Sequence, residues 1–237
     1  LRINDRVIGG LDEESSHKAK DLYSNICDGE LFVTNTSTAE MVKLSENAFR
    51  DVNIAFANEL SMVCDSINVD INELINLSNK HPRVNILNPG CGVGGHCIAI
   101  DPWFIASQFP DKTPLIQQAR DVNTKKTKWV LSKIKKLIAN FKTNKGFIPT
   151  IGCLGLTYKP NIDDIRESPA LKITKELILE GFKIYSADPN LKEVHNIQLI
   201  DFNEVLEKSD LVFILVAHKE FELIQLDDKK VFNLSIS

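Results

Sequence analysis

The chain has 237 residues, 43% of them hydrophobic and 25% charged, a composition typical of a folded protein with one large or two small domains. Its 28 basic and 32 acidic residues give a net charge of −4 without a long basic run, which argues against nucleic acid or an anionic membrane as a partner. No apolar run approaches the about 20 residues of a membrane span, and no signal peptide is evident.

Residues 1–10, LRINDRVIGG, predict a polar turn and a short strand closed by two glycines. Leu1 is not an initiator methionine, so we expect the chain to begin inside a longer one. A helix is predicted over residues 13–27 and a strand over residues 30–34. No G-x-G-x-x-G follows a strand anywhere, so the fingerprint of a dinucleotide-binding fold is missing.

Ser37 and Glu40 have the spacing of a capping box, which predicts that a long helix begins there and continues to about residue 66. At 1.5 Å per residue it would span roughly 40 Å, enough to serve as a spine for two domains or as a dimer contact. Lys43, Asn47 and Asp51 fall on one face of this helix at intervals of four residues. That polar face is either solvated or functional.

Four of the chain's 11 glycines lie within residues 90–95, so the backbone there can take positive φ angles and approach a bulky ligand closely. Cys97 follows this glycine loop, and Asp101 comes four residues later. If residues 98–101 form a first helical turn, thiol and carboxylate project to the same side, and the helix dipole favours the reactive thiolate. A tight turn with a buried free cysteine is the alternative.

The five cysteines are odd in number and contain no C-x-x-C pair, which argues against a disulfide framework or a zinc finger and favours a reducing cytoplasm. A metal site made from Cys91, Cys97, His81 and His96 would crowd its ligands around one glycine turn without the spacing of zinc sites. We therefore expect no metal.

Further helices are predicted over residues 70–79, 102–107 and 113–140, and the lysine-rich residues 125–142 are expected to form an exposed helical face. From about residue 147, strands at 150–156, 182–187 and 211–216 alternate with helices at 169–180 and 202–208. This order predicts a parallel sheet covered by helices, with ligands beyond the carboxyl ends of the strands. Residues 155–169 would occupy that edge, with Ser168 as N-cap and Pro169 in the first helical turn.

Three segments, AEMVKLSENAFRDVNIAFANE, GVGGHCIAIDPWF and GLTYKPNIDDIRESP, resemble the UDP-glucose/GDP-mannose dehydrogenase family, especially its branch acting on UDP-N-acetyl-D-mannosamine. The resemblance implies an α/β protein with an all-helical central dimerisation domain, residues 11–142, followed by a Rossmann-like parallel α/β UDP-sugar-binding domain, residues 143–237. Residues 1–10 would end an NAD-binding domain that is otherwise absent.

In that family NAD oxidises the C6 alcohol of a nucleotide sugar to a carboxylate through a cysteine thioester, and here the product would serve bacterial surface polysaccharide synthesis. The resemblance assigns the nucleophile to Cys97, oxyanion stabilisation to Lys43 and Asn47, and orientation of water to Asp101. A homodimer through the central domain is implied. Two alternatives stay open: an inactive nucleotide-sugar-binding or dimerisation fragment, and a UDP-N-acetylglucosamine 6-dehydrogenase.

The resemblance also implies the binding residues. The nucleotide sugar would contact the loop glycines, the 155–169 segment and an arginine from the neighbouring subunit, and these residues are Gly92, Gly94, Gly95, Tyr158, Lys159 and Arg83. Arg166 would approach the dinucleotide of the partner chain. Arg50, Asp51 and Asn53 stay ambiguous between the edge of the site and helix packing.

Two features depart from the family. Cys91 replaces a usual proline, which is expected to loosen the loop, and the final VFNLSIS predicts a truncated or altered last strand.

Overall fold

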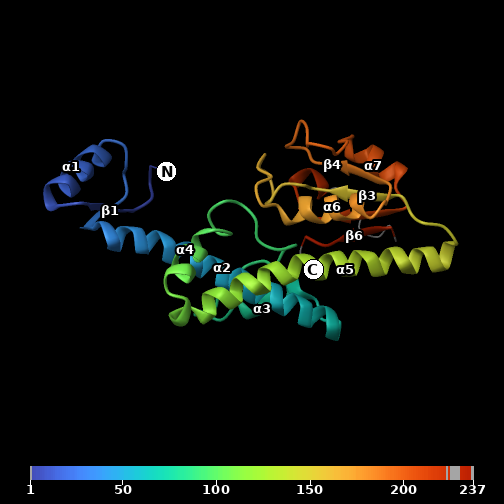
Figure 1. Ribbon diagram of the computed structural model, residues 1–237, viewed down its shortest axis with the longest axis horizontal. Helices are drawn as coiled ribbons and strands as arrows, with labels where there is room; N and C mark the ends of the chain where they lie inside the picture. The colour runs from blue at the N-terminus through green and yellow to red at the C-terminus, as the bar shows by residue number, and fades with distance from the viewer. Residues whose placement is uncertain (1, 223, 225–229, 236–237) are drawn as a thin grey trace.

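The computed structural model describes residues 2–222, 224 and 230–235. Three parts follow one another along the chain: a small β-α-β unit, a group of long helices, and a parallel sheet with its covering helices (Figure 1). No helix among these residues is long and apolar enough to cross a membrane.

The β-α-β unit consists of β1 (Arg6–Gly10), α1 (Glu13–Ser24) and β2 (Leu31–Asn35), and its two strands pair in parallel. Asp12 caps α1 by accepting a hydrogen bond from the N–H of Ser15, whose hydroxyl is within hydrogen-bond distance of the N–H of Asp12 in return. The predicted strands are confirmed, and the helix ends three residues earlier than expected.

The helical part contains α2 (Thr36–Ile67), α3 (Ile71–Ser78), α4 (Asp101–Gln108), the short 3-10 helix η1 (Pro110–Lys112) and α5 (Pro114–Lys145). The predicted capping box of Ser37 and Glu40 is wrong, because Asn35 caps α2 by accepting a hydrogen bond from the N–H of Thr38 at 2.9 Å. Strand β2 runs directly into α2, so its last residue, which is also a good capping residue, takes that position. Asn68, in the left-handed conformation, ends the helix.

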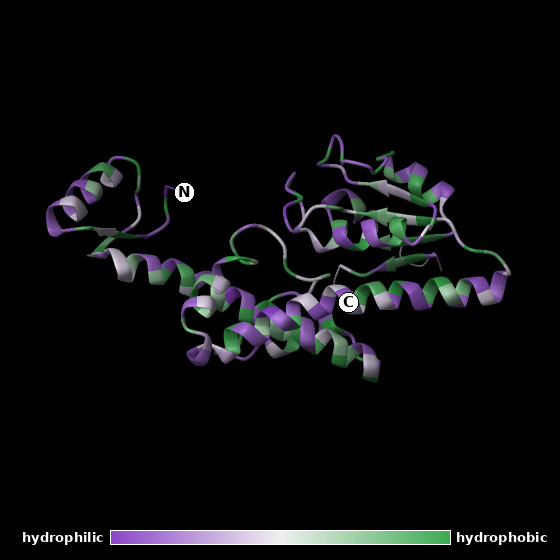
Figure 2. Cartoon of the chain, in the orientation of Figure 1, coloured by the Kyte–Doolittle hydropathy of each residue, from purple (hydrophilic) through white to green (hydrophobic). Residues whose placement is uncertain are grey.

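Helix α5 joins the helical part to the sheet. Ala119 and Val122 in its first half pack on Ala55 of α2, whereas Val130 and Ile134 in its second half pack beneath the sheet. Hydrophobic and hydrophilic residues alternate along α5, as expected for a helix that changes its packing partner (Figure 2). Its 32 residues span about 48 Å. The spine joining two domains is therefore α5, while α2 contacts its first half.

The sheet has the order β4-β3-β5-β6 with all strands parallel; the strands are β3 (Ile151–Leu154), β4 (Ile184–Ala187), β5 (Leu211–Ile214) and β6 (Val231–Asn233). Helix α6 (Pro169–Leu179) shares a hydrophobic core with α5 on one face, and α7 (Phe202–Lys208) contributes Val205 to the other face. A short 3-10 helix, η2 (Lys219–Phe221), follows β5. This confirms the predicted helical domain and Rossmann-like domain. The altered last strand is a three-residue β6, while Ile236 and Ser237 lie outside the described residues.

The expected exposed lysine face is wrong at Lys126, whose side chain is completely buried. Its ammonium donates a hydrogen bond to Ser61 Oγ at 2.6 Å and lies 4.3 Å from the centre of the Trp129 ring. Burial lowers the pKa of Lys126 to about 8, although the nearby Cys91 opposes this shift. The lysine pattern did not reveal that α2 packs over this face of α5.

Candidate functional site

The glycine loop, residues 88–97, packs between α5 and the 155–169 segment. Gly92 has a φ of +134°, and a Cβ there would lie 2.3 Å from Thr127 Oγ1, the hydroxyl that donates to the carbonyl of Cys91. Gly95 has a φ of +81° and would meet the Tyr158 ring at 2.9 Å. Close approach to neighbouring parts of the chain therefore already requires glycine at these positions, and a ligand could contact only their backbone.

Gly94 lies between these two positions, and a Cβ there would come within 2.7 Å of Glu167 O and of Tyr158 Cβ. The N–H of Gly95 donates to the carbonyl of Arg166 at 2.9 Å. The glycine loop and the 155–169 segment, far apart in sequence, are thus directly bonded.

Cys91 does not loosen this loop as expected. It is buried, and its thiol is 3.3 Å from the carbonyl of Leu215 and 3.4 Å from that of Leu234. Burial raises the pKa of Cys91 to about 12, although Lys126 opposes this shift, so Cys91 stays a neutral thiol that anchors the loop to the sheet.

Cys97 is half-buried and begins a hydrogen-bonded turn that leads into α4. Its carbonyl accepts the N–H of Ile100 at 3.1 Å and the N–H of Asp101 at 2.8 Å, so the expected turn is present although α4 itself begins at Asp101. Among the five cysteines only Cys97 is not buried. It is therefore the thiol that a reagent or substrate can reach.

Asn47 and Asp101 come together at this turn. The amide Nδ2 of Asn47, buried on α2, donates to Asp101 Oδ2 at 2.5 Å. Lys43, one turn earlier on α2, is exposed and forms an ion pair with Glu46 at 3.5 Å. The structure thus unites two of the four predicted catalytic side chains beside the Cys97 turn, whereas no described contact joins Lys43 to them.

Asp51, left ambiguous by the sequence, is a packing residue. It is completely buried, and its Oδ1 accepts hydrogen bonds from Arg120 at 2.5 Å and Asn123 at 2.8 Å. Burial raises its pKa although Arg120 and Asn123 lower it. Asn53 also has a structural role, since it holds the backbone of Asn85 and Leu87. Arg50 is exposed.

A cavity of about 390 Å³ lies where the glycine loop meets the carboxyl ends of β3 and β5. We call it the glycine-loop pocket; its wall includes Asn88 to Gly92, Thr157 to Pro160, and Val216 and Ala217. Tyr158 and Lys159, both predicted to bind substrate, line it, and Lys159 Nζ lies 5.7 Å from the centre of the Tyr158 ring. Its position matches that expected for a ligand of an open parallel sheet.

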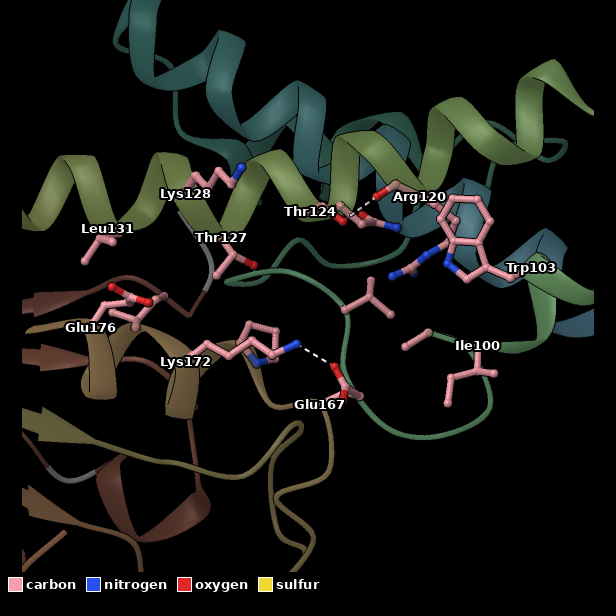
Figure 3. Close-up of a pocket in the computed structure, with 15 residues that line it drawn as sticks. Ile100, Trp103, Arg120, Thr124, Thr127, Lys128, Leu131, Glu167, Lys172 and Glu176 are labelled. Atoms are coloured by element: carbon pink, nitrogen blue, oxygen red, sulfur yellow. Dashed lines mark hydrogen bonds and ion pairs between the residues drawn. The ribbon is translucent and has the colours of Figure 1, made fainter. Parts of the chain in front are cut away.

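A second cavity of about 680 Å³ opens on the other side of the loop, between α4, α5 and α6 (Figure 3). Trp103, Ile100 and Leu131 give it an apolar lining, and an ion pair between Lys172 and Glu167, 2.5 Å apart, stands at its rim. None of the predicted site residues lines it.

Arg166 and Arg83 are both exposed in the single chain. The Arg166 guanidinium donates three hydrogen bonds to the Asp164 carboxylate, at 3.0, 3.0 and 2.6 Å. These hydrogen bonds lower the pKa of Asp164 to about 2. The N–H of Arg83 donates to His81 Nδ1 at 3.3 Å, and no described contact joins its side chain to the glycine loop.

Sequence reasoning missed the buried pair of Asp188 and His218, whose side chains are 3.1 Å apart behind the glycine-loop pocket. Burial alone would raise the pKa of Asp188, but hydrogen bonds from His218 and from the N–H groups of Leu156 and Asn190 outweigh burial and lower it. The position of Asp188 at the end of a predicted strand was the available signal. Among the residues described here, no three His, Cys, Asp or Glu side chains are arranged to hold a metal ion.

Together, the fold and this site define a helical domain joined to a Rossmann-like domain, with a pocket of about 390 Å³ at their junction. Comparison with protein families finds the central domain of the UDP-glucose/GDP-mannose dehydrogenase family over residues 37–125 and its UDP binding domain over residues 152–234. The chain belongs to this family.

Known dehydrogenases of nucleotide sugars are similar to this chain over nearly all of its length. The chain is 50% identical over 232 residues to a UDP-N-acetyl-D-mannosamine dehydrogenase of Campylobacter jejuni, covering 94% of this chain and 56% of that protein. It is 46% identical to an NDP-N-acetyl-D-galactosaminuronic acid dehydrogenase of Ralstonia solanacearum, covering 94% of this chain and 53% of that protein. A solved UDP-D-ManNAc dehydrogenase of Pyrococcus horikoshii superimposes with a TM-score of 0.84 at 36% identity, over 98% of this chain and 55% of the other. The chain thus spans about half the length of these relatives.

Proposed function

We propose that the protein containing this chain oxidises the C6 alcohol of a UDP-N-acetylhexosamine to the uronic acid, with UDP-N-acetyl-D-mannosamine as the favoured substrate. The hydrogen bond between Asn47 and Asp101 carries this proposal, because it brings two candidate catalytic groups to the turn that begins at the accessible Cys97. The names of relatives that are 46–50% identical support the substrate class.

Residues of this chain would perform the acyl-transfer half of the reaction. After a first hydride loss has converted the alcohol to the C6 aldehyde, the Cys97 thiolate would add to it and give a thiohemiacetal. Loss of a second hydride would leave a thioester, which water would hydrolyse to the acid and the free thiol; in this family NAD supplies the hydride-accepting chemistry. The Asn47 amide and the Lys43 ammonium would stabilise the oxyanion, and Asp101 would orient the water. Covalent capture would keep the reactive aldehyde from escaping.

In this family NAD accepts the hydrides, but the described residues do not fit a dinucleotide. The N-terminus of α1, which follows a strand and two glycines, is the nearest candidate for a pyrophosphate site. The Asp12 carboxylate already occupies one of its free N–H groups, that of Ser15, at 2.7 Å, and Asp12, Glu13 and Glu14 place negative charge where a pyrophosphate would bind. We therefore derive no step through NAD from this chain, and a contact from the exposed Arg166 to a partner's dinucleotide remains a proposal.

UDP would occupy the glycine-loop pocket, with Lys159 facing its phosphates. Calorimetry with the 237-residue chain tests this: UDP should bind, and NAD should not. Lys159→Met should weaken UDP binding about tenfold through loss of a charge-assisted contact. Lys183 offers a matched control, since its ammonium also lies over a tyrosine, 5.3 Å from the Tyr185 ring, but outside the pocket. An equal effect of Lys183→Met would contradict the assignment.

We also propose a homodimer through the helical domain. Four apolar side chains at intervals of seven, seven and four residues form a stripe on one face of α2, and each is at least half exposed; they are Phe49, Phe56, Val63 and Ile67. A second copy packed there would cover the stripe and would let Arg83 reach the neighbouring site. The predicted domain boundary at residue 10 would separate β1 from its paired strand β2, and the one at residue 142 falls within α5. The cytoplasmic location and the role in surface polysaccharide synthesis remain proposals as well.

A catalytically inactive nucleotide-sugar-binding protein is the second candidate, since the glycine-loop pocket would hold UDP without any redox chemistry. The sugar epimer is also open, since one relative is named for a galacto sugar and UDP-N-acetylglucosamine has the same functional groups. Assays of the full-length protein with NAD and each UDP-N-acetylhexosamine separate these possibilities: acid formed from the manno epimer supports the proposal, and no turnover with any epimer supports the inactive candidate.

A further inference from the structure

His218 is completely buried just beyond β5, where it contacts the segments that follow two other strands, β3 and β4. Its Nδ1 is 3.0 Å from the backbone N of Asn161 and 2.9 Å from Asn190 Nδ2. Its Nε2 is 3.1 Å from Asp188 Oδ2 and 3.2 Å from Thr157 Oγ1. Sequence patterns gave no role to this histidine.

These partners determine which nitrogen carries the proton. A backbone N–H can only donate, so Nδ1 of His218 must accept from Asn161, and Nε2 must carry the hydrogen that Asp188 accepts. His218 is therefore a neutral imidazole with two distinct ends. Its Nδ1 accepts from Asn161 in the loop after β3, and its Nε2 donates to the Asp188 carboxylate after β4.

The same network supports the backbone of Lys159. Asp188 Oδ2 also accepts the N–H groups of Leu156 and Thr157, at 2.7 and 3.2 Å. The hydroxyl of Thr157 in turn donates to the carbonyl of Lys159 at 3.0 Å. This network therefore holds four residues of the loop. Asp188 holds Leu156 and Thr157, Thr157 holds Lys159, and His218 holds Asn161.

This loop contains a residue in an uncommon backbone conformation. Asn161 has a φ of +60°, in the left-handed region, which asparagine adopts more readily than most non-glycine residues. Its N–H bonds to His218, and its side-chain Oδ1 accepts the N–H of Lys219. On the opposite side of the same loop, Tyr158 and Lys159 face the glycine-loop pocket.

We infer that His218 and Asp188 are positioning residues, which hold residues 157–161 in the conformation that presents Tyr158 and Lys159 to the diphosphate of a UDP-sugar. This inference rests on the proposed function, since it takes the glycine-loop pocket as the UDP site. Neither residue touches the ligand. Their contribution is to make the loop rigid before binding, which removes an ordering cost from the binding step.

Two substitutions separate the two ends of the imidazole. His218→Asn keeps an acceptor at the position of Nδ1, whereas His218→Gln keeps a donor at the position of Nε2 but leaves Asn161 N–H without an acceptor. We expect UDP affinity, measured by calorimetry on the 237-residue chain, to fall about tenfold in the glutamine variant, the consequence of one lost buried hydrogen bond. The asparagine variant loses the bond to Asp188 instead, but Asp188 still holds the N–H groups of Leu156 and Thr157, so UDP affinity should stay within about threefold of the unmodified chain.

Hydrogen exchange without ligand gives an independent readout. The amide of residue 161 should exchange at least about tenfold faster in His218→Gln than in His218→Asn, while amides of β3 and β5 should not differ between them. His195, an exposed histidine of the same domain, provides the control, and His195→Gln should change neither measurement. If the two His218 variants behave alike, or if exchange rises throughout the sheet, the residue is only part of the packing and the inference is wrong.

If the proposed function were wrong, the measurements would differ from those expected if only the role of His218 were wrong. An unmodified chain that binds no UDP would overturn the assignment of the pocket, and the exchange difference would still decide whether His218 positions the loop. Should both His218 variants fail to fold, Thr157→Val tests the same network by removing the hydrogen bond to the Lys159 carbonyl with little change in shape. Unchanged UDP affinity and unchanged exchange at residue 161 in that variant would refute the inference.

Discussion

Asn47 and Asp101 are 54 residues apart in the sequence, yet the amide of Asn47 donates to the carboxylate of Asp101 at 2.5 Å. This contact ties α2 to the start of α4, directly after the turn that begins at Cys97. It fixes the amide orientation, because only Nδ2 of Asn47 can donate to a carboxylate. The pair therefore lies directly after the turn that begins at Cys97, whose thiol alone among the five cysteines is not buried.

Replacing Asn47 by Asp tests this contact, because it would place two carboxylates within hydrogen-bond distance. Both cannot be ionised there, so the folded pair retains a proton that the unfolded chain releases at neutral pH. The free energy of unfolding should fall by about 1–3 kcal/mol at pH 7 and recover as the pH is lowered toward 5. Urea denaturation at several pH values measures this. Ser45→Asp, exposed on the same helix, should show no such pH dependence.

Cys97→Ser should abolish acid formation in the full-length protein while UDP-sugar binding survives. An oxygen nucleophile is poorly ionised at neutral pH, and an ester is a poorer acyl donor than a thioester. Cys91→Ser is the matched control: it lies six residues away, and a hydroxyl could still donate to the carbonyls of Leu215 and Leu234. Product analysis by mass spectrometry would measure the acid. Near-normal acid production by Cys97→Ser, or loss only in Cys91→Ser, would remove Cys97 from the mechanism.

Lys126 should make the stability of the chain depend on pH. Its pKa is about 8 in the folded chain and 10.5 in the unfolded chain, so between these values the unfolded state binds more protons. The free energy of unfolding of the unmodified chain, relative to Lys126→Met, should therefore rise from pH 8 to pH 10.5. Denaturant titrations at both pH values measure the slope. For Lys125→Met, at an exposed neighbouring position, the difference in free energy of unfolding from the unmodified chain should not change with pH. If the difference for Lys126→Met does not change with pH either, Lys126 is not buried as described.

Phe56→Glu should convert the proposed dimer into a monomer. The substitution places a charge in the middle of the apolar stripe on α2, where a second copy would have to desolvate it. Analytical ultracentrifugation at micromolar concentration would report the change in mass. Leu179→Glu introduces the same charge at an exposed apolar position on α6 and should leave the dimer intact. A monomeric unmodified chain would contradict the proposal directly.

The sequence alone determined the order of elements, the parallel sheet and the glycine loop with its cysteine. Helix periodicity, the alternation of apolar strands with helices, and local caps such as Ser168 act over a few residues, so they can be read without knowing the fold. The family resemblance added the candidate roles of Cys97, Asn47, Asp101 and Lys159. The structure joins Asn47 to Asp101 directly after the turn that begins at Cys97, and Lys159 lines the glycine-loop pocket.

Tertiary structure decided what depends on which elements pack together. Lys126 looked like its exposed neighbours until α2 covered it, and Cys91 was expected to loosen a loop that it anchors. Asn35 displaced the predicted cap because β2 leads straight into α2. His218 gained its partners only when the ends of three parallel strands met at one edge. Burial and long-range hydrogen bonds arise between residues distant in sequence, and no local pattern encodes them.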